Sequence, residues 1–359
     1  MVKINTLHIS PSLVNASCAW ASELEQLTAL YDSPFTGAVT TRTATLEGFQ
    51  EDASHTVIPV AFAFITRAHA CHHRKVAFTK STVSTINSYG YSPHPLSQYI
   101  SWARELLRRP SPAGQPKKPF ILSITSSDPA KLRVMVQTIQ RLRTELGDAD
   151  APSSSIAIEL NTSCPNIPNS PPTGYAFPSL VPLLSILKEE HAKDPSLTIG
   201  LKLPPFVYRD QFVAVIDGIK NLCLAPDASA TCPFAFFTCT NTLGNSLLFD
   251  EQSTRPAPSS EATLDTSPSP FAVPTGLGGV AGDALHALAL GNVYTFAQLL
   301  RDPSNAFLRD TVIIGVGGVT SKAACDRMRR AGAAVVGCAT LLGKEGVTAF
   351  EIIADGQRE

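Results

Sequence analysis

Charge is scarce in this sequence, and so are long hydrophobic runs. Charged residues make up 16% of the 359 residues and hydrophobic residues 44%, which excludes an intrinsically disordered chain. The 29 basic and 30 acidic residues leave a net charge of −1, without the basic stripe that a nucleic-acid partner requires. No apolar run approaches the ~18 residues that span a bilayer. We therefore expect a packed globular protein that binds a small molecule, without nucleic-acid or membrane partners.

Targeting and disulfide signals are also lacking. The first twenty residues, MVKINTLHISPSLVNASCAW, show neither a secretory signal nor an Arg-rich transit segment. The eight cysteines are scattered without a CxxC pair, so we expect free, buried thiols and a cytoplasmic location. His69, Cys71, His72 and His73 stand too close along the chain to converge on one ion. No second ligand pair has matching spacing, so we expect a loop there and no metal site.

The sequence does contain a regular alternation of short apolar runs with amphipathic stretches. The runs are near-continuous in apolar residues, which is typical of parallel strands buried on both faces. They lie at residues 12–17, 37–43, 119–125, 155–163, 197–205, 234–242, 311–319 and 333–342. The stretches that we expect to be helices include residues 22–31, 131–146, 180–193 and 321–332.

Eight strands that alternate with helices predict a (β/α)8 TIM barrel, an α/β fold. The rival fold, an open doubly wound sheet, normally has a Gly-rich first turn, whereas the first run here continues as NASCAW without GxGxxG. Residues 44–118 and 246–282 interrupt the alternation, and loops of this length on a compact barrel usually serve as lids or binding walls. We predict one domain over residues 1–359, with these long insertions on the C-terminal face of the barrel.

Polar residues gather where the predicted strands end. Barrel enzymes place their chemistry at the C-terminal ends of the strands. Two cations and several amides at one rim are costly to bury without an anionic or hydrogen-bonding ligand, so we expect one binding site there. The residues at these ends are Ala16, Ser17, Arg42, Thr43, Asn161, Ser163, Cys164, Lys202, Asn241, Thr242, Gly317, Gly318, Ala339 and Thr340.

The last two strand ends, GVGGV and GCATLL, allow two interpretations. Glycine lets backbone N–H groups approach a phosphate at this part of a barrel, and Gly278 and Gly279 would add a third wall. Glycine pairs also form ordinary turns, so a phosphate site and a turn are equally good hypotheses.

Lys202 and Cys164 each stand in an unusual context. Lys202 lies in the apolar run GLKLPP. A lysine that reaches the surface is one interpretation, but apolar neighbours on both sides favour a buried cation that binds an anion such as a reduced flavin. A lone cysteine is usually a small buried hydrophobe. Cys164 nevertheless follows a strand end among Asn161, Thr162 and Ser163, and a thiol of ordinary pKa about 8.5 also serves for proton abstraction.

The motif ELNTSCPN at residues 159–166 resembles ELNLSCPN of dihydroorotate dehydrogenases, particularly the soluble class 1A type. Further motifs match in the same order along nearly the whole chain. NAS (15–17) resembles the family's first strand end, STINSYG (84–90) resembles SINSMG, and GLKLPP (200–205) resembles GVKLPP. NTLGNSL (241–247) resembles NSIGNGL, GLGGVAG (276–282) resembles GFGGIGG, IIGVGGV (313–319) resembles IIGTGGI, and KEG (344–346) is shared.

The resemblance implies an FMN-dependent enzyme that oxidises (S)-dihydroorotate to orotate in pyrimidine biosynthesis. It implies that Cys164 takes the proton from C5 while a hydride passes from C6 to flavin N5. It also implies a cytoplasmic homodimer that passes electrons to fumarate or a similar soluble acceptor. The residues implied to bind the substrate are Arg42, Asn87, Tyr89, Gly90, Tyr91, Asn161, Asn166, Asn241 and Thr242. Those implied to bind FMN are Ala16, Ser17, Arg42, Thr43, Asn87, Asn161, Lys202, Thr242, Gly279, Gly317, Gly318, Ala339 and Thr340.

The sequence departs from the family pattern near the implied site. Arg42 replaces a lysine that contacts flavin and substrate, Cys18 replaces a glycine, and Tyr89 and Tyr91 replace Met and Leu of INSMGL. The segment before Asn87 is also longer than in the family. Two alternatives therefore stay open. One is an FMN oxidoreductase that acts on another cyclic imide, enone or pyrimidine-like compound, and the other is a catalytically weak paralogue that binds flavin or a partner.

Overall fold

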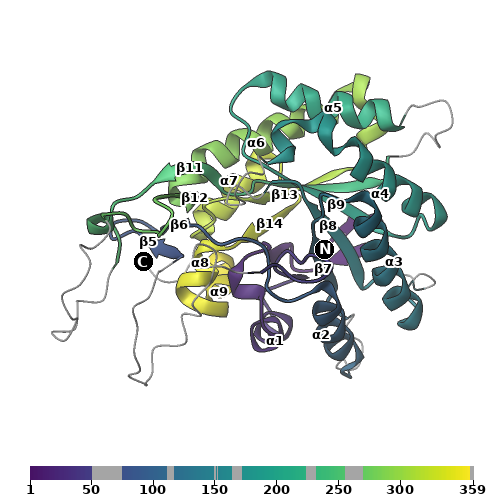
Figure 1. Cartoon of the computed structure of the whole chain (residues 1–359), viewed down its shortest axis with the longest axis horizontal. Coiled ribbons are helices and arrows are strands. Elements are labelled where there is room, and N and C mark those ends of the chain that lie inside the picture. Colours follow the sequence, from purple (N-terminus) through teal and green to yellow (C-terminus); the bar gives the residue numbers. More distant parts are fainter. Residues whose placement is uncertain are drawn as a thin grey trace.

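Eight parallel strands form a nearly closed barrel in the computed structural model, which describes residues 1–50, 75–110, 117–148, 151, 153–163, 172–223, 232–254 and 270–355. Around the barrel the strands follow one another in chain order, with helices between them (Figure 1). The strands are β3 (Leu13–Asn15), β4 (Val39–Thr40), β7 (Phe120–Ile124), β8 (Ile156–Asn161), β9 (Thr198–Leu203), β10 (Phe234–Cys239), β13 (Val312–Val316) and β14 (Val335–Cys338). The predicted (β/α)8 fold is confirmed.

Each of the eight apolar runs contains a strand that is shorter than the run itself. The run at residues 333–342, for example, contains β14 over Val335–Cys338, because Thr340 already begins a helix. The run at 234–242 ends as a strand at Cys239, and the residues that follow turn into the mouth of the barrel. Most polar residues at the ends of the runs therefore lie just beyond the strands, whereas Asn161 and Lys202 are still part of β8 and β9.

The seam between β3 and β4 is closed largely by one side chain. Backbone pairing there is limited to a single bridge between Val14 and Ala38 and a bond from Gly37 N to Leu13 O. Asn15 extends it, because its Nδ2 donates to Thr40 O at 2.6 Å and its Oδ1 accepts from Thr40 N at 2.9 Å. The amide thus takes the place of a peptide group in the ladder.

Helices cover the outer face of the barrel and bury their apolar sides against the strands. Local signals set their ends: Asp128 accepts from Ala130 N at the start of α3 (Pro129–Glu145), and Ser321 accepts from Ala324 N at the start of α7 (Lys322–Ala331). Within the described residues, no helix is long and apolar enough to cross a membrane. The helices are α1 (Leu24–Asp32), α2 (Leu96–Arg108), α3 (Pro129–Glu145), α4 (Val181–Lys193), α5 (Arg209–Cys223), α6 (Asp283–Arg301), α7 (Lys322–Ala331), α8 (Thr340–Glu345) and α9 (Ala349–Asp355).

A hairpin of β1 (Val2–Ile4) and β2 (Leu7–Ile9) lies at the N-terminal ends of the barrel strands. Its residues Ile4, Leu7 and Ile9 are almost fully buried against inward-facing side chains of the barrel. This end of the barrel is therefore filled with apolar side chains, and the opposite end is left for ligand binding.

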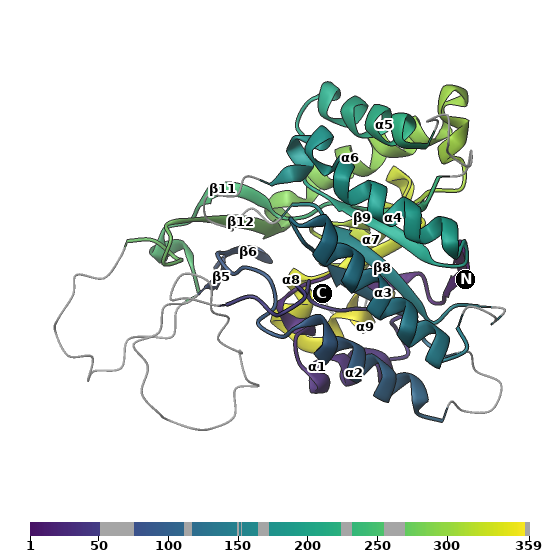
Figure 2. The same cartoon turned by 45° about the vertical axis from the view of Figure 1, so that its right-hand side comes forward.

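The two long insertions pair with each other, which the sequence did not predict. Strands β5 (Val76–Phe78) and β6 (Ser84–Asn87) come from the first insertion, and β11 (Leu243–Leu247) and β12 (Leu277–Gly282) come from the second or border it. They form one antiparallel sheet in the order β11-β12-β6-β5. In both views this sheet projects from one side of the barrel (Figures 1 and 2). Helix α2, within the predicted insertion 44–118, packs on the barrel as one of its outer helices.

A buried arginine ties the end of α3 to the starts of two barrel strands. The Arg143 side chain is 1% exposed, and its Nε lies 3.1 Å from Asp148 Oδ2. Its other nitrogens donate to Asp194 and to the hydroxyl of Ser196, just before β9, and to the hydroxyl of Ser154, just before β8.

Replacing Arg143 with methionine should therefore destabilise the fold strongly. The change leaves the carboxylate of Asp148 buried without its cation, which typically costs about 3–5 kcal/mol. Arg108→Met is a matched control, because Arg108 is 58% exposed in its ion pair with Glu145 and should cost less than about 1 kcal/mol. Urea unfolding followed by circular dichroism measures both, and equal midpoints for the two variants would contradict the assignment.

Candidate active site

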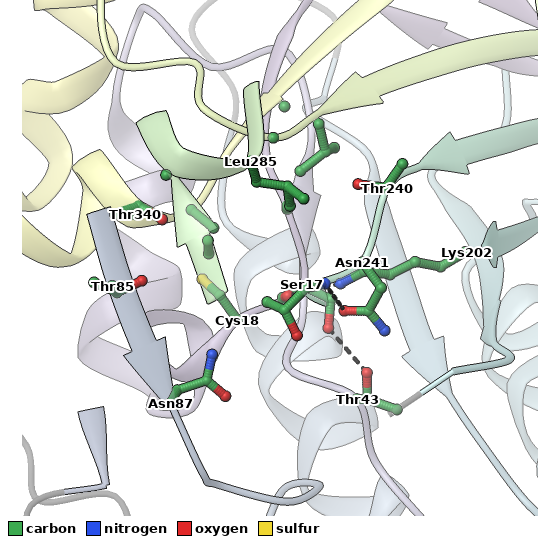
Figure 3. Close-up of a pocket in the computed structure, with 18 of the residues that line it drawn as sticks. Ser17, Cys18, Thr43, Thr85, Asn87, Lys202, Thr240, Asn241, Leu285 and Thr340 are labelled. Carbon is green, nitrogen blue, oxygen red and sulfur yellow. Dashed lines mark hydrogen bonds between the residues drawn. The ribbon is translucent and has the colours of Figure 1, made fainter. Parts of the chain in front are cut away.

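A pocket opens at the C-terminal ends of the barrel strands (Figure 3). Residues that the sequence placed at seven strand ends meet here, together with residues of the β6–β12 sheet. The predicted site residues that line it are Ala16, Ser17, Arg42, Thr43, Asn87, Tyr89, Gly90, Tyr91, Asn161, Lys202, Asn241, Thr242, Gly317, Gly318, Ala339 and Thr340.

Three predicted site residues are not among those that line the pocket. Gly279 lies beside it in β12, where its carbonyl accepts a hydrogen bond of 3.0 Å from Nδ2 of Asn87. Cys164 and Asn166 lie outside the described residues, as do His69, Cys71, His72 and His73. The roles assigned to Cys164 and Asn166 therefore stay predictions.

Several lining residues were missed in the sequence, although two of them carried a signal. Thr85 stands two residues before Asn87 on β6, so both point to the same face of the sheet. Thr240 directly precedes Asn241 at the end of β10. The others gave no comparable signal: Trp20, Ala281, Gly282, Leu285, Val316, Val319 and Gly337.

Lys202 brings a buried positive charge to the pocket. The residue is 4% exposed, and its Nζ donates to the carbonyl oxygen of Ser17 at 3.0 Å (Figure 3). Among the residues that the structure describes, no carboxylate pairs with it. An ammonium group has three protons to donate, so the site is suited to an anionic or acceptor-rich ligand.

Two asparagines next to Lys202 hold each other in fixed orientations. Nδ2 of Asn161 donates to Thr43 Oγ1 at 3.0 Å, while its Oδ1 accepts from Ser163 N and from Asn241 Nδ2, each at 3.1 Å. Oδ1 of Asn241 in turn accepts from Thr242 N at 3.0 Å. The amide ends of β8 and β10 thus form one rigid, polar wall of the pocket.

Arg42 anchors the loop that carries Tyr89 and Tyr91. Its Nη2 donates to Gly90 O at 3.2 Å and to Tyr91 O at 2.9 Å, and its guanidinium lies 5.4 Å from the centre of the Tyr89 ring. The residue is 3% exposed. One nitrogen of the buried guanidinium thus holds two successive carbonyl oxygens of the loop.

Gly317 and Gly318 follow β13 with φ angles of 127° and 66°. A Cβ at Gly317 would lie 2.5 Å from Ala289 Cβ, and one at Gly318 would lie 2.5 Å from His286 Cβ. Close packing against α6 and the positive φ values therefore both require glycine here. The same two residues expose backbone to the pocket, so the turn and the ligand-binding interpretations are compatible.

Two further polar groups in the pocket differ in what they offer a ligand. The hydroxyl of Thr240 is buried and has no hydrogen-bond partner among the described residues, which leaves it available to a bound molecule. Burial raises the pKa of the Cys18 thiol to about 11, although the backbone at Trp20 and the charges of Lys202 and Arg42 act in the opposite direction. The thiol of Cys18 therefore stays protonated near neutral pH.

Six cysteines within the described ranges are free and five of them are buried, as the sequence predicted.

For Cys18, the raised pKa predicts very slow alkylation in the native protein. At pH 8 its thiolate fraction is about 100-fold lower than that of a thiol of pKa 9.0, and burial slows access further. Iodoacetamide labelling followed by peptide mass spectrometry measures this, with the urea-unfolded chain as control. Equal labelling rates in the two states would show that Cys18 is exposed and ionised.

Sequence comparison gives the site a family context. Residues 72–359 match the family model of dihydroorotate dehydrogenase. A protein of Streptococcus equi subsp. equi, assigned the name dihydroorotate dehydrogenase A (fumarate), is 26% identical over 354 residues, which cover 98% of this chain and 89% of that protein. A protein of Streptococcus agalactiae with the same assigned name is 25% identical and covers 97% of this chain and 88% of that protein.

Structure comparison supports the same fold. The ligand-free dihydroorotate dehydrogenase of Eimeria tenella matches with a TM-score of 0.65 and 15% sequence identity. The match covers 99% of this chain and 85% of that one. The structural match thus bears out the fold, and the sequence matches confirm the resemblance to the class 1A-like type that the motifs indicated.

Proposed function

This chain belongs to the dihydroorotate dehydrogenase family, and on that premise we propose that it oxidises (S)-dihydroorotate to orotate with FMN as its cofactor. Membership makes it an oxidoreductase that acts on a CH–CH bond. The observation that carries the proposal is the buried ammonium group of Lys202, which has no carboxylate partner among the described residues and lies in the pocket formed by the family's motifs.

The described residues fit a flavin nucleotide. The pocket lies at the C-terminal ends of the barrel strands, and glycine residues at the ends of β12 and β13 contribute backbone to its lining. Lys202 supplies a cation, and Thr240 supplies a buried hydroxyl that lacks a partner within the described part of the chain. We assign the cofactor to the predicted set, namely Ala16, Ser17, Arg42, Thr43, Asn87, Asn161, Lys202, Thr242, Gly279, Gly317, Gly318, Ala339 and Thr340.

When bound, FMN supplies a two-electron acceptor for the hydride that leaves C6 of the substrate. The protein contributes orientation and charge. Lys202 favours negative charge in the pocket, because its ammonium group is buried and its single described partner is the carbonyl oxygen of Ser17. Asn161 and Asn241 hold fixed amide groups beside it, which suits them to position a planar, polar ring.

We assign the base that removes the C5 proton to Cys164, on its position in the SCPN motif. Cys18 is the thiol that lines the described pocket, and burial raises its pKa to about 11. A group that holds its proton at neutral pH is a poor base, so Cys18 does not compete for this role.

We assign the substrate to Arg42, Asn87, Tyr89, Gly90, Tyr91, Asn161, Asn166, Asn241 and Thr242, as the resemblance implies. Arg42 supports the loop of this site through the carbonyl oxygens of Gly90 and Tyr91. Fumarate as acceptor, a homodimer and a cytoplasmic location belong to the same proposal and rest on the likeness to class 1A enzymes.

A second candidate is an FMN oxidoreductase that acts on a different cyclic imide, enone or pyrimidine-like compound. The specific observation in its favour is the Arg42–Tyr89 contact at 5.4 Å, which places an aromatic ring at the mouth of the pocket where the family motif has methionine.

Anaerobic mixing of the flavin-loaded protein with L-dihydroorotate should bleach the flavin absorbance rapidly. Bleaching would support dihydroorotate as the reductant. Retention of a fully oxidised flavin after mixing would contradict the proposed substrate and favour the second candidate.

The rate of this bleaching, followed by stopped-flow absorbance, tests the assignment of the base. Cys164→Ala should slow bleaching about 10²–10⁴-fold, the range that general bases contribute. Cys18→Ser is the matched thiol control and should slow it far less. Equal rates for Cys164→Ala and the unmodified protein would remove Cys164 from the mechanism.

Replacing Lys202 with methionine should make the bound flavin harder to reduce. A lost bond to a charged group is worth about 1.5–3 kcal/mol, which corresponds to a fall of about 30–60 mV in a two-electron reduction potential. Lys131→Met is the control, because Lys131 is half exposed in a surface pair with Glu47. Potentials are read against a reference dye, and an unchanged value for Lys202→Met would show that its charge does not act on the flavin.

A further inference from the structure

A row of hydroxyl groups runs from the pocket into the interior of the barrel. Ser17 Oγ and Thr43 Oγ1, which both belong to residues that line the pocket, are 3.0 Å apart (Figure 3). Thr43 Oγ1 is 3.0 Å from Ser123 Oγ, and Ser123 Oγ donates to Glu159 Oε1 at 3.1 Å. The ends of β3 and β4 are thereby connected to the interior of β7 and β8.

Glu159 is a buried carboxylate at the inner end of this row. The residue is 2% exposed, and Thr238 Oγ1 of β10 donates to its other oxygen, Oε2, at 2.6 Å. Both oxygens thus accept a hydrogen bond from a hydroxyl group. No described cation pairs with it, so the two hydroxyl groups carry most of its stabilisation.

Proton counting fixes the direction of every hydrogen bond in the row, because each hydroxyl has one proton. Ser123 gives its proton to Glu159, so between Thr43 and Ser123 the donor must be Thr43. Thr43 has then used its proton, so between Ser17 and Thr43 the donor must be Ser17. Asn161 Nδ2 also donates to Thr43, which is consistent, since the Thr43 oxygen then accepts two bonds and donates one.

The consequence appears at the pocket. The hydroxyl proton of Ser17 is used in the hydrogen bond to Thr43, so the Ser17 oxygen can only accept a hydrogen bond from a ligand. We propose that Glu159 is a positioning residue that acts through Ser123 and Thr43 to make Ser17 an obligatory hydrogen-bond acceptor for an imide N–H of the ligand. This inference rests on the proposed function and deepens it.

The imide N–H has two sources under the proposed function. The ring system of a flavin carries one, and so does the dihydropyrimidine substrate. Both have the same donor chemistry toward Ser17. Flavin affinity and orotate affinity, measured separately, distinguish them.

A purely structural Glu159 is the competing explanation, and the barrel offers a matched pair of variants to separate the two. Ser123→Ala and Thr238→Val each remove one hydroxyl donor from the same carboxylate, in the same buried interior. Only Ser123→Ala interrupts the row to the pocket. Thr43→Val interrupts the row of hydroxyl groups one residue nearer the pocket, and it replaces Ser123→Ala in the experiment if that variant does not fold.

The experiment measures the dissociation constant of FMN by fluorescence and that of orotate by titration of the flavin spectrum, with thermal midpoints recorded alongside. Ser123→Ala should raise one of the two dissociation constants about five- to tenfold, which corresponds to the loss of one hydrogen bond. Thr238→Val should change neither dissociation constant by more than about twofold. The double variant Ser123→Ala/Thr43→Val should lose no more affinity than Thr43→Val alone, because both changes break one path.

Loss confined to FMN would identify the flavin as the imide donor, and loss confined to orotate would identify the substrate. Equal losses for Ser123→Ala and Thr238→Val would overturn the inference, and so would unchanged constants in Ser123→Ala. Flavin affinity is measured without turnover. The dissociation constants therefore test this inference whether or not dihydroorotate reduces the enzyme.

Discussion

The site depends on a positive charge, that of Lys202, which is buried without a carboxylate partner among the described residues. Lys202 lies on β9 between β8 and β10, and the described part of the chain offers its ammonium group a carbonyl oxygen instead of a carboxylate. Removing such a group from water is costly, so the fold must be stable enough to bear that cost until a ligand shares the charge. The apolar hairpin at the opposite end and the layer of helices outside supply that stability.

The pocket is assembled from parts that are distant along the chain. Asn161 and Asn241 cross-link β8 and β10 through their amides, and β6 from the first insertion pairs with β12 from the second. Arg42 then connects the end of β4 to the loop after β6. The insertions are thus a second structural layer with its own sheet, and they hold one wall of the site at a fixed distance from the barrel.

The sequence allowed the barrel and most of the pocket to be predicted, because buried parallel strands are apolar and their polar ends must converge. Hydrophobic pattern identifies strands but not the partners of strands outside the barrel, so the pairing of β6 with β12 was not foreseen. The contact of Arg42 Nη2 with the carbonyl oxygens of Gly90 and Tyr91 depends on local geometry and carries no sequence signal. Ser123 and Glu159 were overlooked for a related reason: each stands inside an apolar run, where a polar residue is easily taken for an interruption. The roles of Cys164 and Asn166 stay predictions.

The seam at Asn15 has a bearing on how this pocket changes in evolution. Ser17 follows β3 by two residues and Thr43 follows β4 by three, so the Asn15 amide and a single backbone bridge set the spacing between the two sides of the site. Elsewhere around the barrel that spacing is shared among several peptide groups and tolerates the loss of any one. Here it depends on few contacts, of which the two bonds of the Asn15 side chain lie nearest to the pocket. Selection on the width of the pocket at this edge therefore acts on a residue that is not among those lining it.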